Sequence, residues 1–108
     1  MSRYSDIKMA EISVIDERTA TYLAEFFSAL SDTSRVRIIS ALTHGEMNVG
    51  TLAEIVGISE SAVSHQLRGL RQMRLVRARK VGRQVFYCLD DEHVTDLFQR
   101  GLEHIQHS

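Results

Sequence analysis

The segment between Val49 and Met73 constrains the fold more than any other part of the chain. Val49 to Val56 has the length and apolar character of a short helix, and Gly57 follows as its stop. Ser59 then begins a longer segment as its N-cap. The apolar residues of this second segment recur at helical spacing on one face, at Val63, Leu67 and Leu70. A short helix, a glycine-containing turn and a longer helix predict a helix-turn-helix over 49–73.

The flanking segments complete a single small domain. Apolar spacing predicts amphipathic helices over 15–31 and 91–107, the first beginning at Asp16 and the second capped by Asp90 or Asp91. A further helix is expected between the capping residues of Ser31–Arg35 and Gly45. Two β-branched and aromatic runs flank Lys80–Arg83, so 75–89 is expected to form a β-hairpin wing. We therefore predict one winged helix-turn-helix domain over 1–108, mainly α with a small β-hairpin, and expect it to be homodimeric.

Length and composition exclude several classes of protein. A chain of 108 residues can bury one core but not two, and 44% apolar with 25% charged residues is ordinary for a globular domain. The apolar stretches are far shorter than the roughly 18–20 residues that cross a bilayer, and the first residues lack the layout of a signal peptide. We expect no membrane association and a cytoplasmic location. With Cys88 as the single cysteine, any metal site must use histidine and carboxylate.

The charge is distributed unevenly along the chain. Residues 59–84 carry a net charge of +6 and the remainder −7, although the whole chain is at −1. A basic block on an acidic body is typical of a face that binds phosphate. The alternative is a solvated basic helix and hairpin without a partner. The cations of the block are Arg68, Arg71, Arg74, Arg77, Arg79, Lys80 and Arg83.

The second helix of the motif would be the recognition helix in the major groove of double-stranded DNA. Small and hydrogen-bonding side chains near its start suit base edges, and here they are Ser61, Ser64, His65 and Gln66. Long cations suit phosphate, and we assign this role to Arg68, Arg71, Arg79, Lys80 and Arg83. Two alternatives stay open: Gln66 could face solvent or the neighbouring helix, and His65 could be a buried hydrogen-bonding histidine.

Three histidines share one face of the expected C-terminal helix. At 100° per residue His104 and His107 lie within about 40° of His93 around the helix axis. Along the axis, however, His93 and His104 are about 16 Å apart, whereas zinc holds nitrogen ligands at about 2.0–2.1 Å. One helix therefore cannot close a site around these residues.

Two such helices packed antiparallel about a dyad would bring the groups together. Each of two equivalent sites would take Asp91 and His93 from one chain and His104 and His107 from the other. Three imidazoles and one carboxylate form a closed tetrahedral set suited to Zn²⁺. We expect the metal to fix a dimer geometry in which the two recognition helices no longer fit successive major grooves. The alternative is three exposed histidines near a frayed end of the chain.

The sequence resembles the ArsR/SmtB family of metal-sensing repressors from about Asp16 to His107. The matching strings are LAEFFSALSDTSRVRIISAL, SESAVSHQLRGLR and VGRQVFYCLDDEH, followed by the D-x-H and H-x-x-H patterns. In the zinc and cobalt/zinc branch those last patterns form the inter-subunit metal site, which the resemblance places on Asp91, His93, His104 and His107. It further implies that the metal-free dimer binds an inverted-repeat operator and that metal lowers DNA affinity, derepressing metal efflux or sequestration genes. His104 would then donate to a backbone carbonyl near Arg74.

The resemblance also ranks the metals. Members that sense soft metals carry thiolates where this chain has Asn48 and Gly50, and nickel sensors tend to use ligands from a terminal extension, whereas this sequence has no histidine near Met1 and stops at Ser108. Zn²⁺ is therefore expected first and Co²⁺ second. Cys88 is expected to be a half-buried apolar residue.

Two other functions remain to be compared with this one. The chain could be a repressor of the same fold that responds to something other than metal. It could also be a small metal-dependent hydrolase, but such an enzyme needs an open coordination position and a general base. The sequence supplies four ligands and no such pocket motif, so we expect no enzymatic activity.

Overall fold

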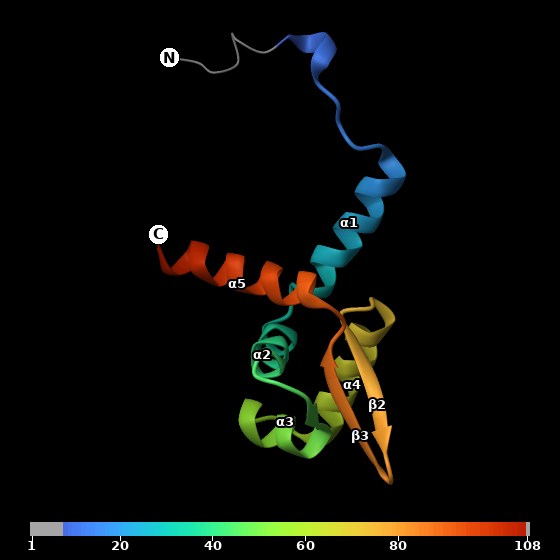
Figure 1. The fold of residues 1–108 in the computed structure, drawn as a ribbon, viewed down its shortest axis with the longest axis vertical. Helices are drawn as coiled ribbons and strands as arrows, with labels where there is room; N and C mark the ends of the chain where they lie inside the picture. The colour runs from blue at the N-terminus through green and yellow to red at the C-terminus, as the bar shows by residue number, and fades with distance from the viewer. Residues whose placement is uncertain (1–7, 108) are drawn as a thin grey trace.

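The computed structural model describes residues 8–107 and has the element order of a winged helix-turn-helix (Figure 1). A 3₁₀ turn at Met9–Glu11 comes before the domain proper. The elements that follow are α1 (Glu17–Ala29), α2 (Thr33–Leu42), β1 (Met47–Asn48), α3 (Val49–Val56), α4 (Glu60–Gln72), β2 (Val76–Val81), β3 (Gln84–Leu89) and α5 (Glu92–Gln106). The expected fold class is confirmed, with the expected 15–31 and 91–107 helices slightly shorter. Among the described residues, no helix combines the length and apolar character needed to cross a bilayer.

Side-chain caps set where the helices begin. Asp16 accepts from the Thr19 N–H and Ser59 from the Ala62 N–H, as their positions predicted. At α5 the cap is Asp91 rather than Asp90. Gly57 ends α3 with a φ of 78°, a left-handed conformation that glycine adopts without steric cost. The turn between α3 and α4 is therefore fixed from both sides.

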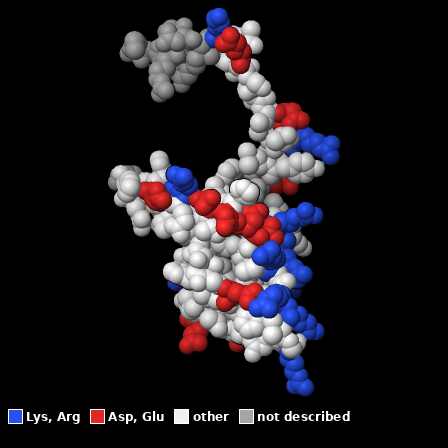
Figure 2. All heavy atoms as spheres, viewed as in Figure 1, with Lys and Arg blue, Asp and Glu red and all other residues white. Residues whose placement is uncertain are grey.

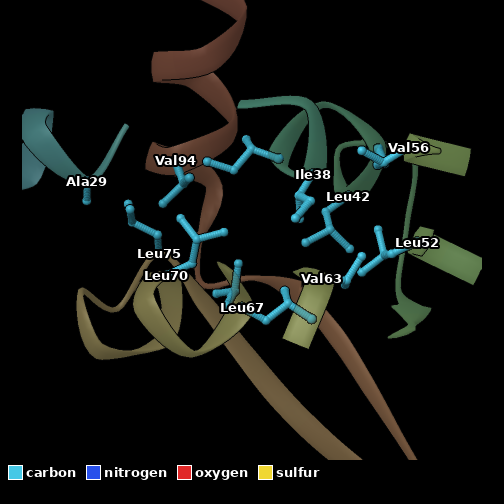
Figure 3. Packing of buried hydrophobic residues seen from close by; sticks show 13 residues of the cluster. Ala29, Ile38, Leu42, Leu52, Val56, Val63, Leu67, Leu70, Leu75 and Val94 are labelled. Carbon is cyan, nitrogen blue, oxygen red and sulfur yellow. The ribbon is translucent and has the colours of Figure 1, made fainter. Parts of the chain in front are cut away.

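The core lies where α2, α3 and α4 meet the base of the sheet (Figure 3). The stripe predicted on α4 is fully buried, with Val63, Leu67 and Leu70 at 0–1% exposure. It packs with Ile38 of α2 and Leu52 of α3, which are also at 0%. Among residues 8–107 every buried side chain is apolar. Packing alone therefore determines which face of α4 remains outside.

The sheet has three antiparallel strands in the order β1-β3-β2. The expected hairpin is present, but the turn expected over residues 80–83 is wrong, because Lys80 and Val81 belong to β2 and pair with Val85 and Gln84. Gly82, at a φ of 61°, permits this tighter turn. The strand β1 was not predicted, since two residues are too few to show an alternating pattern. It pairs with Tyr87 and Phe86 of β3 and so ties the start of α3 to the wing.

The helices α1 and α5 extend away from this body (Figure 1). Within α1, which is described completely, Ala29 is the only buried residue, and within α5 it is Val94. Tyr22, Leu23 and Phe27 of α1 remain 44–59% exposed. Exposed apolar side chains grouped in this way are typical of a surface that contacts another molecule.

A hydrogen-bond cluster centred on Arg35 joins three of the helices. Its Nε donates to Gln66 Oε1 of α4 at 2.7 Å, and its Nη1 donates to the Ala29 carbonyl at the end of α1 at 3.1 Å. The guanidinium also lies over Gly69, where the Cβ of any larger residue would come within 3.2 Å of Nη2. Arg35 therefore fixes how the end of α1 sits relative to α4.

We expect Arg35→Met to destabilise the fold by about 1–3 kcal/mol, because the part-buried Gln66 oxygen and Ala29 carbonyl lose their donor while the apolar stem is kept. The measurement is chemical denaturation followed by circular dichroism. Arg37→Met is the matched control, since Arg37 is an exposed arginine on the same helix. Equal losses in the two variants would contradict a specific role for Arg35.

Candidate nucleic-acid interface and metal-ligand pairs

The outward face of α4 carries most of the side chains predicted to contact DNA. Ser61, Ser64 and His65 are exposed in its first two turns. The open alternative of a buried His65 is thereby removed. Ser61 Oγ lies 3.3 Å from the capping Ser59 Oγ, so the start of the helix presents a small polar surface. Such a surface suits base edges in a groove.

A second group forms where α4 faces the wing. Ser64, Arg68 and Arg71 line a shallow depression together with Leu67 and with Tyr87 of β3. The exposed cations of the block continue along the wing, and Figure 2 shows lysines and arginines gathered on the side of the molecule that carries it. Lys80 lies on β2 beyond this depression, and Arg83 is in the exposed turn at the wing tip. Tyr87 was not among the predicted residues, because nothing distinguishes it from its apolar neighbours in the sequence.

Besides Ser61, two residues of the predicted DNA-contacting set have side-chain partners inside the protein. The carbonyl oxygen of Gln66 accepts from Arg35, so Gln66 faces the neighbouring helix, which was the alternative left open for it. Arg79 forms two hydrogen bonds with Glu46, which precedes β1. Both residues therefore have structural partners in addition to any contact with DNA.

The four predicted metal ligands form two pairs at opposite ends of α5. Asp91 and His93 are at its start, with Asp91 Oδ1 3.3 Å from His93 Nδ1. Asp91 Oδ1 also accepts from the His93 and Val94 backbone N–H groups, so the same carboxylate caps the helix. His104 and His107 are exposed at the other end, where they line one shallow depression with Arg100 and Glu103.

One chain does not bring the two pairs together. At about 1.5 Å per residue, His93 and His104 are about 16 Å apart along α5. Across residues 8–107, no three histidine, cysteine or acidic side chains gather closely enough to hold a metal ion. A site shared between two antiparallel helices of different chains requires such a separation of the ligand pairs within one chain.

Cys88 is half-buried on β3, as expected. Its Sγ accepts from Arg77 Nε at 3.3 Å, and this hydrogen bond raises the pKa of the Arg77 guanidinium. Arg77 and Cys88 are opposite each other in the hairpin, so the contact is a cross-strand pair. It stabilises the base of the wing.

Known proteins with related sequences agree with this architecture. Residues 32–78 match the family described as "Bacterial regulatory protein, arsR family". The "Transcriptional repressor SmtB homolog" of Synechocystis sp. is 48% identical over 102 residues, which cover 94% of this chain and 77% of that protein. The "Cadmium resistance transcriptional regulatory protein CadC homolog" of Staphylococcus aureus is 41% identical over 83 residues, covering 76% and 69%.

A solved structure shares the fold over most of the chain. The homodimeric winged helix-turn-helix DNA-binding domain Mb0332 of Mycobacterium bovis superposes with a TM-score of 0.77 at 26% identity, covering 88% of this chain and 91% of that one. These relatives are transcriptional regulators rather than enzymes, which agrees with the expectation of no enzymatic activity. The chain belongs to the arsR family of bacterial transcriptional regulators.

Proposed function

We propose that the protein is a homodimeric repressor that binds an inverted-repeat operator through α4 and the wing, and that Zn²⁺ bound between two α5 helices lowers its affinity for DNA. The observation that carries the DNA-binding part is the orientation of α4. Its apolar stripe is fully buried, so Ser61, Ser64 and His65 face outward beside Arg68 and Arg71. A regulator of this kind works where the DNA is, so we assign it to the cytoplasm.

The contacts divide by chemistry. Ser61, Ser64 and His65, with the amide nitrogen of Gln66, would contact base edges in the major groove. Arg68, Arg71, Lys80 and Arg83 would contact phosphate and set the salt dependence of binding. Their location supports this division, because Arg68 and Arg71 follow the small residues along α4 while Arg83 is at the wing tip.

The dimer is proposed to form through α1 and α5. Both helices leave apolar side chains exposed, and an apolar groove runs between them and α2, lined by Leu30, Val36, Ile39, Val94, Leu97, Phe98, Gly101, Leu102 and Ile105. The homodimeric state of the M. bovis domain supports a homodimer here. Burial of these faces in a dimer would stabilise it by roughly 25 cal/mol for each Å² of apolar surface removed from water.

The donor set fits Zn²⁺ or, second, Co²⁺. Asp91 and His93 of one subunit would bind the metal ion together with His104 and His107 of the partner subunit. The ligands would then be three imidazoles and one carboxylate. A carboxylate has about four lone-pair positions, so Asp91 can cap α5 and still hold a metal. Bound metal would supply a rigid link between the two α5 helices. The cadmium-resistance name of the S. aureus relative supports a metal as the effector.

Two backbone hydrogen bonds connect the start of α5 to α4. The Asp90 N–H, next to the cap of α5, donates to the Leu75 carbonyl at 3.0 Å, and the Leu75 N–H donates to the Leu70 carbonyl in α4 at 2.9 Å. Leu70, Leu75 and Val94 are packed in one core. A change in the angle of α5 would therefore be transmitted to the end of the recognition helix. A hydrogen bond from His104 to a carbonyl near Arg74 would add a second link.

The DNA-binding part is tested on duplexes selected from a random-sequence pool by the metal-free protein. With fluorescence anisotropy over a range of KCl concentrations, we expect Arg68→Gln to reduce the slope of log K against log salt by about 1.8, the value for two phosphate contacts, one from each subunit of the dimer. Arg37→Gln on α2 is the matched control and should keep the wild-type slope. Equal slopes for Arg68→Gln and the wild type would contradict the proposed contact.

The dimer is tested by placing a charge on the exposed face of α1. Leu23→Glu is expected to convert the protein to a monomer in sedimentation velocity, since Leu23 is 44% exposed in a single chain and would be buried in the dimer. Thr21→Glu adds the same charge about 200° around the helix and should leave the dimer intact. A dimeric Leu23→Glu protein would exclude this interface.

The metal-binding part is tested with two variants that preserve the fold. Asp91→Asn keeps an N-capping side chain but removes the carboxylate charge, and His104→Leu removes a ligand that is exposed in one chain. Both should bind DNA as the wild type does but no longer be released by zinc, and His44→Leu should behave as the wild type. The wild-type dimer should take up two tight equivalents of zinc. No tight uptake would favour a repressor with another effector, whereas release of His104→Leu by zinc would contradict the proposed site on α5.

A further inference from the structure

The pair formed by Glu46 and Arg79 crosses the small sheet. Arg79 Nη2 lies 2.6 Å from Glu46 Oε1, and Arg79 Nε lies 3.0 Å from Glu46 Oε2, so the guanidinium is held at two points. Glu46 is in the loop before β1 and Arg79 is on β2, at the opposite edge of the sheet from β1. The contact lowers the pKa of the Glu46 carboxyl through the hydrogen bond from Arg79. A two-point arginine–carboxylate pair has a defined geometry that one lysine could not supply.

Strand register shows how the pair crosses the sheet. Phe86 of β3 is opposite Arg79 of β2 on one side and opposite Asn48 of β1 on the other. The Arg79 side chain therefore crosses β3 to reach the carboxylate before β1. Asn48 also donates to Gln84 at 2.7 Å and caps α3 through the Thr51 N–H. The loop before α3 and the wing are thus joined at two places.

Register also separates Arg79 from the cations of the recognition helix. Side chains alternate between the two faces of a strand, so Arg79 shares a face with Arg77 and Cys88. Tyr87, on the other face of the sheet, lines the depression with Arg68 and Arg71. Lys80 shares the face of Tyr87, because it follows Arg79 by one residue. Arg79 is therefore on the side of the sheet away from the recognition helix.

We propose that Glu46 is a positioning residue that, by pairing with Arg79, keeps this arginine from contacting DNA phosphate. The same ion pair holds the wing against the helix-turn-helix. This inference rests on the proposed DNA binding. An arginine already paired with a carboxylate gains little by exchanging that anion for a phosphate. Loss of the Glu46 charge would leave Arg79 unpaired on the wing, which is proposed to contact DNA, and an unpaired cation there strengthens binding to any sequence. Glu46 thereby limits the affinity of the protein for DNA of unrelated sequence.

The test compares Glu46→Gln, Arg79→Gln, the double variant and Glu54→Gln on a random-sequence duplex at several KCl concentrations. Glu46→Gln should steepen the salt slope by about 1.8, or about 0.9 for each subunit of the dimer, so that its affinity relative to the wild type changes by about 12-fold between 50 and 200 mM salt. The double variant should return to the wild-type slope. Glu54→Gln removes the same charge from an exposed position on α3 and is the control for net charge.

Two slope results would overturn the proposal. Arg79→Gln with a slope shallower than the wild type by about 1.8 would mean that Arg79 of each subunit contacts phosphate while Glu46 is present. Glu46→Gln with the slope of Glu54→Gln would mean that Glu46 does not restrain Arg79.

A second measurement separates this inference from the DNA-binding proposal. In the free protein, hydrogen exchange of the β2 and β3 amides should be faster in both Glu46→Gln and Arg79→Gln than in Glu54→Gln, because the wing has lost a contact with the loop before β1. Unchanged exchange would overturn the role of the pair in holding the wing, whether or not the protein binds DNA. A wild-type protein that binds no duplex would instead refute the DNA-binding proposal.

Discussion

The burial of one stripe of α4 is the interaction on which the rest of the structure depends. Val63, Leu67 and Leu70 are inserted among residues of α2, α3 and the base of the sheet. Because these side chains cannot rotate into water without loss of the core, the opposite face of α4 has a fixed direction. Every polar side chain on that face is therefore positioned by contacts made on the other side of the helix. A surface of this kind is preorganised, and ordering it for a ligand costs little entropy.

Much of this fold could be predicted because its signals are local. The caps Asp16 and Ser59, the stop at Gly57 and the helical spacing on α4 each act within a few residues of their own position. The pairing of β1 with β3 and the contact of Arg35 with Gln66 join residues about 30–40 positions apart, and no periodicity in the sequence encodes them. For the same reason the carboxylate partner of Arg79 could not be found from the sequence. The distribution of charge along the sequence identified the basic block, but it could not distinguish paired cations from exposed ones.

The proposed metal site shows what the sequence does encode at long range. The two pairs of ligands are about 16 Å apart on one straight helix, and helix geometry alone fixes that distance. The spacing is therefore informative about assembly, because it is compatible with a shared site only in a symmetric oligomer. The structure supplies what the spacing could not, namely that Asp91 caps α5 while its Oδ1 lies 3.3 Å from Nδ1 of the His93 ring. In the proposed dimer, α1 and α5 together would determine how the two subunits approach each other.

The short strand β1 has a consequence for the length of the wing. It pairs with β3 at Phe86 and Tyr87, so the last two rungs of the hairpin, Lys80–Val85 and Val81–Gln84, are held by each other and by the side chain of Asn48. Two residues added to each strand would advance the tip by about 7 Å and keep every side chain on its present face, whereas one residue added to each would exchange the faces beyond the insertion. The strands of the wing can therefore lengthen by two residues at a time without changing which face each side chain occupies. The distance that the wing extends from the domain can change in this way while the helix-turn-helix stays the same.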